Sequence, residues 1–344
     1  MPTKSRIEYL DLAKGFCIIL VALNHIILSY HAEMPLAHVF RAMRLPLYFF
    51  LSGCFFKQYN GFSDFLKRKT NKLLIPFIFW FLFISVLIAY IYGQLGIPVF
   101  TRHPVSPLFS FKRLYHESNF VNLPIWFLLC LFEINIIFYL IHTLVYKIFK
   151  RRQTLAICLL SLLLGSVGLL LFRHNINLPF YLDNALESTP FFAFGYVCFR
   201  YTKLLQSNPT DKFFPLILIA LALFLYFFAP RESILSTTPV ATRNYLFYHI
   251  SGFVGATFII ILSKWIQYIP VIRWWGRYSI IILILHGPFY LHIVRIFKHY
   301  HIFINQPWIA SLLTLALTMA CCSAAIPICK RFFPHVTAQK DLLH

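Results

Sequence analysis

The stretch EYLDLAKGFCIILVALNHIIL, residues 8–28, indicates the class of this protein. Its apolar run is long enough to cross the hydrocarbon core of a bilayer, which takes about 20 helical residues. Asp11, Lys14 and His25 lie inside this run or at its edge. A charge at the middle of a bilayer costs from about 3 kcal/mol upward, so ionisable residues in a span usually carry a function. The segment is therefore predicted to be a membrane-spanning helix with a functional polar face.

The composition of the whole chain also predicts an integral membrane protein. Of its 344 residues, 59% are hydrophobic and 12% are charged, with a mean hydropathy of +0.71, whereas soluble domains carry about 25% charged residues. Segments long enough to span a bilayer recur at roughly 9–31, 37–57, 71–93, 123–146, 153–173, 188–202, 213–229, 244–267, 276–297 and 306–330. We expect an all-α polytopic protein of about ten transmembrane helices, with residues 1–344 forming one membrane domain and no appended soluble domain.

The lysine and arginine residues predict how the chain is oriented. If the N-terminus is cytoplasmic, 21 of the 31 basic residues lie at cytoplasmic helix ends and loops. The other ten lie on the outer side, namely Arg41, Arg44, Arg102, Lys112, Arg113, Arg173, Arg231, Arg243, Arg295 and Lys298. This excess follows the positive-inside rule and predicts cytoplasmic N- and C-termini. It also accounts for the net charge of +20, so we expect no nucleic-acid partner.

The eight cysteines lie within or at the edges of apolar stretches, and none forms a C-x-x-C pair. They are interpreted as small apolar side chains in helices, and no metal site is predicted. The first apolar run lacks a small-residue cleavage site, so we expect it to stay in the protein as a signal anchor.

The polar residues of the first helix share one face. Lys14 and His25 are eleven positions apart, which places them about 20° from eclipsed. His25 lies about 16 Å beyond Lys14, past the middle of the bilayer. In a structural interpretation, Asp11 pairs with Lys14 while His25 bonds to a neighbouring helix. In a functional interpretation, this face lines a polar tunnel with cations at its cytoplasmic mouth and a histidine, suited to proton transfer, at its depth.

The pattern YLDLAKGFCIILVALNH, residues 9–25, resembles the opening helix of the acyltransferase-3 family of membrane O-acyltransferases. In that family ten residues separate an arginine from an invariant histidine. Here Lys14 and His25 hold these places, within a frame that also contains Tyr9, Asp11 and Gly15. Lysine offers a point charge where arginine offers a bidentate fork, so the substitution affects the expected phosphate contact and leaves the histidine unchanged.

The segment KRKTNKLLIPFIFW, residues 67–80, resembles the family's basic R-x-x-R element before a membrane helix. Lys69 and Lys72 hold that spacing, and Arg68 is adjacent. Four further motifs follow the family's order: LPLYFFLSGCFF at 45–56, which contains Ser52 and Gly53, LPIWFLLCLFE at 123–133, FFAFGYVCFR at 191–200 and WGRYSIIILILHGPFY at 275–290.

The resemblance implies transfer of an acyl group, usually acetyl, from cytoplasmic acyl-coenzyme A to a hydroxyl of a glycan or lipid-linked sugar. It implies a protein of the bacterial inner membrane, surrounded by membrane lipids, with acetyl-coenzyme A as a substrate and no metal cofactor. Catalysis would rest on His25, acting either as a general base on the acceptor or as a covalent acyl carrier. The sequence favours neither route and leaves a homo-oligomer open.

Four cations, Lys14, Arg68, Lys69 and Lys72, are candidates for binding the donor phosphates. The alternative is that they only follow the positive-inside rule. Ser52, with the adjacent glycine, allows either a ligand or a helix to approach closely.

Three supporting residues lie on later helices. Trp126 is interpreted either as an interfacial anchor or as a lining of the acceptor channel. Glu133 at mid-span is expected to face the bundle, toward a basic residue or His25. His286 is the second histidine deep in a span, and a packing role or a role in catalysis fits it.

Two other classes of protein remain as alternatives. A transporter or flippase for a glycolipid or small solute also has about ten helices, although no inverted repeat is visible. A haem protein would need paired histidines, for which His25, His142 and His286 are the candidates, but the predicted topology does not place them at matched depth.

Overall fold

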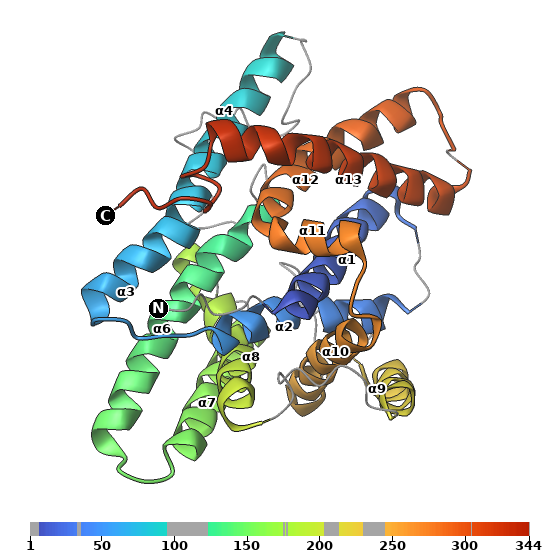
Figure 1. Ribbon diagram of the computed structural model, residues 1–344. Coiled ribbons are helices and arrows are strands. Elements are labelled where there is room, and N and C mark those ends of the chain that lie inside the picture. Colours follow the sequence, from blue (N-terminus) through green and yellow to red (C-terminus); the bar gives the residue numbers. More distant parts are fainter. Residues whose placement is uncertain are drawn as a thin grey trace.

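The computed structural model describes residues 7–32, 36–94, 123–174, 176, 178–202, 213–229, 245–303 and 305–343, and within these ranges every regular element is helical (Figure 1). The elements are α1 (Glu8–Tyr30), α2 (Ala37–Cys54), α3 (Phe62–Lys69), η1 (Thr70–Leu74), α4 (Ile75–Gln94), η2 (Leu123–Ile125), α6 (Trp126–Ile148), α7 (Gln153–Arg173), η3 (Pro179–Tyr181), α8 (Leu182–Tyr201), α9 (Phe214–Phe228), α10 (Tyr245–Ile266), α11 (Pro270–Arg277), α12 (Ser279–His299) and α13 (Pro307–Phe332). The all-α prediction is therefore confirmed for the described part of the chain.

Each of the ten expected spans overlaps a helix, although 188–202 covers only the later part of α8 and 276–297 begins in α11 and continues into α12. By length and hydropathy, six helical segments within the described ranges are able to cross a membrane: Glu8–Tyr30, Trp126–Ile148, Gln153–Leu171, Phe247–Ile266, Ser279–His299 and Pro307–Phe332. The full count of ten and the cytoplasmic orientation stay predictions. The expected outer-side residues Arg102, Lys112, Arg113, Arg231 and Arg243 lie outside the described residues.

The expected span at 71–93 differs from the structure at its start. The helical stretch begins earlier, at Phe62, and runs through the π-helical η1 into α4. The added first part, α3, contains four charged residues, so a hydropathy window does not include it. The basic motif therefore lies on a continuous helical stretch that begins before the apolar span.

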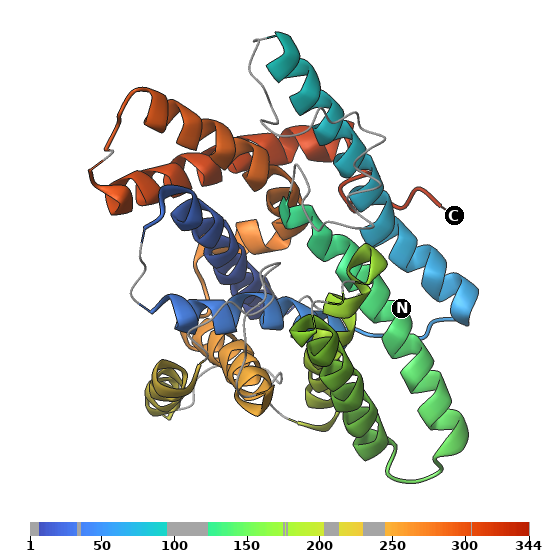
Figure 2. The same ribbon diagram turned by 180° about the vertical axis from the view of Figure 1, so that it is seen from behind.

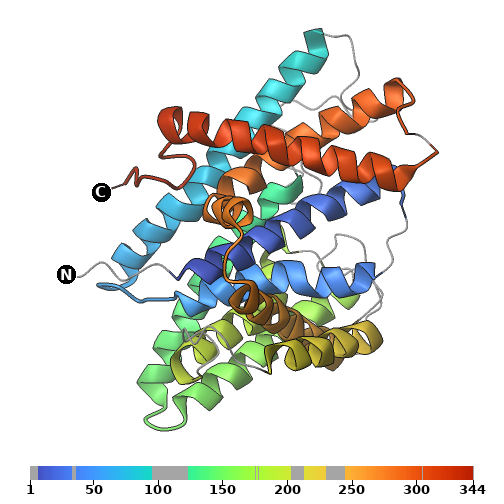
Figure 3. The same ribbon diagram turned by 45° about the vertical axis from the view of Figure 1, so that its right-hand side comes forward.

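Helices α1 and α2 lie at the centre of the molecule. Helix α1 contacts α11, α12 and α13 on one side, whereas α2 contacts α8 and α10. Figure 2 shows α6, α7 and α8 side by side beyond α2, and α9 packs against α10 at the edge. In Figure 3, α1, α12 and α13 run alongside one another across the bundle.

Small residues allow the central helices to approach one another closely, as is common between membrane helices. A Cβ atom on Gly276 of α11 would collide with the carbonyl oxygen of Asp11, and one on Gly15 would collide with the backbone of Ile272. Across the other side, Gly53 of α2 packs directly on the backbone of Phe192 in α8. The contacts of Gly15 and Gly276 fix α11 against the start of α1, where the candidate site lies.

Candidate active site

A cavity of about 260 Å³ lies where α1, α2, α3, α6, α11 and α12 meet. Its polar and charged lining side chains are Lys14, Tyr48, Ser52, Lys69, Arg277, Ser279 and Gln339, and the remainder are chiefly leucine and phenylalanine. Three lining residues are cations and none is an acid, so the cavity suits a ligand with several negative charges. Three predicted donor-site residues, Lys14, Ser52 and Lys69, meet here.

Lys14 reaches the cavity from the first turns of α1. Its Nζ lies 3.9 Å from Oδ1 of Asp11, which is buried, and 5.8 Å from the centroid of the Phe55 ring. The interpretation that Asp11 pairs with Lys14 is therefore compatible with a cavity-lining role for Lys14. Tyr48 of α2 closes this corner, because its hydroxyl donates to the carbonyl oxygen of Lys14 at 3.1 Å.

Lys69 is the member of the basic motif that reaches the cavity. It lies at the end of α3, with its Nζ 5.6 Å from the centroid of the Phe65 ring. Burial lowers the pKa of Lys69 to about 8, since desolvation disfavours the charged form. The π-helical η1 follows at once, and such wide turns are frequent at functional sites.

The other two cations of the motif have protein partners outside the cavity. The Nε of Arg68 lies 2.8 Å from Oδ1 of Asp64, and its guanidinium lies over the Tyr59 ring. Lys72 turns to the C-terminal segment, where its Nζ lies 2.8 Å from Oδ1 of Asp341. Of the three cations in the sequence motif, Lys69 therefore lines the cavity, and the other two lie outside it.

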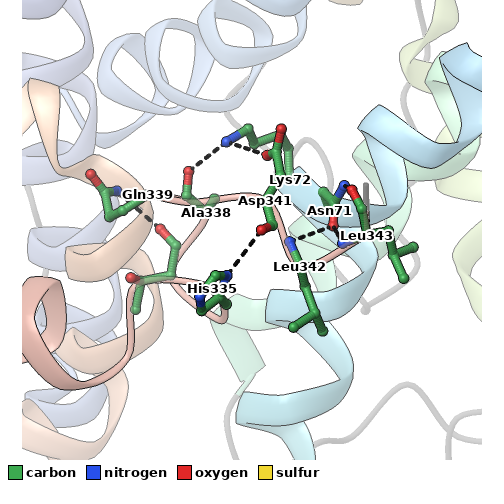
Figure 4. Close-up of polar contacts among 9 residues, drawn as sticks. Asn71, Lys72, His335, Ala338, Gln339, Asp341, Leu342 and Leu343 are labelled. Atoms are coloured by element: carbon green, nitrogen blue, oxygen red, sulfur yellow. Dashed lines mark hydrogen bonds and ion pairs between the residues drawn. The ribbon is translucent and has the colours of Figure 1, made fainter.

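The C-terminal segment, residues 333–343, folds back against η1 and α4 (Figure 4). Asn71 donates from Nδ2 to the Leu343 carbonyl oxygen at 2.9 Å, while its Oδ1 accepts from the backbone N–H groups of Leu342 and Leu343. Lys72 donates to the Ala338 carbonyl oxygen at 3.0 Å. The segment thereby brings Gln339 to the cavity, and no sequence motif predicts this residue there.

His25 and His286 meet deeper in the bundle. Their ring centroids are 5.7 Å apart, and the Tyr290 ring stacks on His25 at 6.2 Å. His286 is fully buried, and its Nδ1 lies 2.9 Å from the carbonyl oxygen of Ile282. Because a carbonyl only accepts, Nδ1 carries the proton, and Nε2 has no hydrogen-bond partner among the described residues. The structure thus pairs two histidines that are 261 positions apart, which corrects the expectation from the predicted topology that His25 and His286 do not lie at matched depth.

Two helices connect the cavity with the histidines. Lys14 and His25 lie on one face of α1, about 16 Å apart along its axis. Ser279 and His286 likewise lie about 20° from eclipsed on α12, about 10 Å apart along the axis. The cationic cavity and the histidine pair therefore lie at two depths along the same helix faces.

Trp126 and Glu133 lie on α6 and do not line the cavity. The Trp126 ring packs on Tyr181 with a centroid distance of 5.4 Å. Glu133 has a buried Oε2 without a hydrogen-bond partner among the described residues, and the Asp183 carboxyl group lies within electrostatic range. His142, on the same helix, bonds instead to the hydroxyl of Tyr196 at 2.7 Å.

Sequence reasoning missed four polar residues of this region: Tyr48, Arg277, Ser279 and Gln339. A signal existed for Arg277, which lies within the motif at 275–290. Within the described residues, no group of three or more histidine, cysteine, aspartate or glutamate side chains is arranged to hold a metal ion.

Comparison with known proteins gives one match. A family model described as an acyltransferase domain matches residues 7–326, a range that contains the histidine pair and all the cavity-lining residues except Gln339. No curated protein and no solved structure matches the chain. The family match confirms the resemblance that the sequence motifs indicate.

Proposed function

Because the chain belongs to the acyltransferase-3 family, we propose that it moves an acetyl group from acetyl-coenzyme A to a hydroxyl of a glycan or lipid-linked sugar. The family match makes it a membrane acyltransferase, and the donor and acceptor are the proposal. One observation carries it: a cavity with three cations lies on the same helix faces as the pair of His25 and the buried His286.

The cavity fits the charged part of coenzyme A. Coenzyme A carries a pyrophosphate and a 3′-phosphate, and Lys14, Lys69 and Arg277 offer three cations without a competing acid in the lining. The guanidinium group of Arg277 is able to donate two hydrogen bonds to one phosphate, whereas the lysines at positions 14 and 69 offer point charges. Arg68 and Lys72, which have partners elsewhere, are not assigned to the phosphates in this proposal.

The apolar part of the donor extends toward His25. Besides its cations, the cavity is lined by apolar side chains such as Leu51, Phe55 and Leu283, which suits the largely uncharged pantetheine arm. The arm places the thioester near the histidine pair, about 16 Å beyond Lys14 along α1. Acyl transfer requires the reacting atoms to come nearly into contact. A bound pantetheine arm holds the thioester in place for this.

In one route, the His25 imidazole takes the proton from the acceptor hydroxyl. The hydroxyl oxygen attacks the thioester carbonyl carbon, the C–S bond breaks, and the coenzyme A thiolate leaves and takes up a proton. In the other route, an imidazole nitrogen of His25 attacks the carbonyl carbon, expels the thiolate, and later passes the acetyl group to the acceptor oxygen. Both routes yield an ester and free coenzyme A.

The location of the cavity supports a cytoplasmic N-terminus. Lys14 from the start of α1 and Gln339 from the C-terminal segment line the same cavity, so both ends of the described chain lie at the donor-binding end. Acetyl-coenzyme A is a cytoplasmic metabolite, so we place this end in the cytoplasm and the protein in the bacterial inner membrane.

The test is transfer of label from radiolabelled acetyl-coenzyme A by the full chain in proteoliposomes that contain membrane glycolipids. We expect label in the glycolipid pool with the wild type and its loss in His25→Ala. The control is His142→Phe, which replaces another histidine in a span while keeping a ring beside Tyr146. Label retained on wild-type protein without acceptor would select the covalent route.

Two outcomes would contradict the proposal. Equal turnover by wild type and His25→Ala would make His25 a structural residue. A wild type that neither binds nor cleaves the donor would favour the transporter alternative, which flux of glycolipid between the leaflets would then measure.

A further inference from the structure

Arg44 is a buried cation to which no role has been given so far. Its side chain lies on α2 with only 7% of its surface exposed. Its Nε has no hydrogen-bond partner, and within the described residues no ion pair involves the guanidinium. The groups close enough to interact with it electrostatically are Arg41, which is also a cation, Cys17 and His25. No acid among them neutralises it.

An uncompensated charge inside a membrane protein is costly. Removing an ion from water without a partner costs several kcal/mol even after relaxation. Arginine does not lose its proton to avoid this cost, because its guanidinium stays charged in proteins. An unneutralised arginine in this position therefore points to an anionic ligand that is present only during function.

The position of Arg44 follows from the pattern along α2. Arg44, Tyr48, Leu51 and Phe55 lie within about 60° of one another around the helix, and the last three line the cavity. Arg44 thus continues the cavity-lining face deeper into the bundle, about 12 Å beyond Ser52 along the axis. The Cys17 thiol donates to the backbone carbonyl oxygen of Arg44, which fixes this part of α2 against α1.

Three helices consequently place a nitrogen-bearing side chain at about the same depth in the bundle. Each carries a cavity-lining residue near the donor-binding end and a nitrogen-bearing side chain further in, namely His25 on α1, the buried Arg44 on α2 and the buried His286 on α12. Acyl transfer develops negative charge on one atom at this depth: the thioester carbonyl oxygen, which becomes an oxyanion when the carbonyl carbon is attacked.

We propose that Arg44 is the oxyanion-binding residue of the acyl transfer, donating N–H groups to the carbonyl oxygen of the thioester as it becomes negative beside His25. The inference rests on the proposed function. During the step the carbonyl π electrons move to this oxygen when the nucleophile attacks, and they return when the C–S bond breaks and the thiolate leaves. Arg44 exchanges no proton or bond in the cycle.

The experiment measures single-turnover thioester cleavage of radiolabelled acetyl-coenzyme A by the full chain in proteoliposomes. The variants are Arg44→Met, Arg44→Lys and Arg44→Ala, with Lys264→Met as a matched control that removes another buried cation, on α10. We expect Arg44→Met to lower the rate at saturating donor about 10²–10³-fold. Donor affinity should change less than about threefold, Arg44→Lys should be intermediate, and the control should resemble the wild type.

Chemical rescue separates this role from a structural one. Guanidinium ion added to Arg44→Ala should restore part of the cleavage rate, and this readout stays available if Arg44→Met does not fold. Unaltered cleavage in Arg44→Met would overturn the inference while leaving the proposed function intact. Intact cleavage with lost affinity for an acceptor would also overturn it and would make Arg44 a site for an acidic acceptor. A wild type without cleavage would overturn the proposed function, and this inference with it.

Discussion

The imidazole rings of His25 and His286 lie 5.7 Å apart between their centroids, at an angle of 40°. One histidine comes from the first helix and the other from α12, and the backbone carbonyl of Ile282 fixes the proton of His286 on Nδ1. A neutral His286 therefore presents the lone pair of Nε2 in a buried environment without a protein partner among the described residues. The arrangement suits a pair in which one imidazole orients or relays a proton for the other.

His286→Asn tests this pairing. The asparagine amide keeps a donor for the Ile282 carbonyl but removes the basic nitrogen at the Nε2 position. If His286 handles a proton for His25, acetyl transfer should fall about 10²–10⁴-fold while the melting temperature changes little. Turnover is measured in proteoliposomes with His142→Phe beside it. An unchanged rate would assign His286 to packing.

The affinity for acetyl-coenzyme A should depend on pH through Lys69. Burial lowers the pKa of Lys69 to about 8, so the side chain is charged at pH 7 and mostly neutral at pH 9. A neutral amine does not bind phosphate strongly, so the Kd for the donor should rise about tenfold from pH 7 to pH 9. Isothermal titration of detergent-solubilised protein measures it.

Lys69→Arg is the control for that pH dependence, because arginine stays charged throughout this range. Its Kd should be nearly flat between pH 7 and pH 9. An equal rise in both proteins would mean that another group, on the protein or on the donor, causes the effect.

The C-terminal segment should be held more strongly by Asn71 than by Lys72. Asn71 makes three hydrogen bonds to the backbone of Leu342 and Leu343 from a buried position, and losing them costs about 1–3 kcal/mol. The side chains of Lys72 and Asp341 are 45% and 40% exposed, so their pair contributes at most about 1 kcal/mol.

Hydrogen exchange of residues 335–343 measures this difference. Exchange should increase strongly in Asn71→Ala and only slightly in Lys72→Met. The reverse order would show that the charge pair, and not the amide, attaches the segment. Because Gln339 lines the cavity, release of the segment should also speed dissociation of the donor.

Gly276→Ala should loosen the junction of α1 and α11. The added Cβ would collide with the Asp11 carbonyl oxygen, so the helices must separate, at a cost of about 1–3 kcal/mol. We expect a lower melting temperature and weaker donor binding, since Lys14 and Arg277 flank this contact. Ala324→Val, which enlarges an exposed side chain of α13, is the control and should change neither. Equal melting temperatures for Gly276→Ala and the wild type would contradict the tight packing.

Sequence alone determined the properties that depend on local chain geometry. The apolar runs indicated the helices, because a backbone in lipid must satisfy its hydrogen bonds internally. The helical period placed Lys14 and His25 on one face before any partner was known. Local reasoning was weaker at α3, where charged residues hid the start of the helix.

Which distant residues meet depends on how the helices pack. His25 and His286 meet because helices distant in sequence pack together, with close contacts such as Gly276 on Asp11. Lys14 and Gln339 meet because Asn71 and Lys72 hold the C-terminal segment beside the cavity. The basic motif likewise divides between the cavity and the C-terminal segment, since η1 and the folded-back chain determine where each lysine lies. In lipid, helices associate through shape complementarity and interhelical hydrogen bonds rather than through an apolar face. The periodicity of apolar residues in the sequence therefore does not reveal which helices pack together.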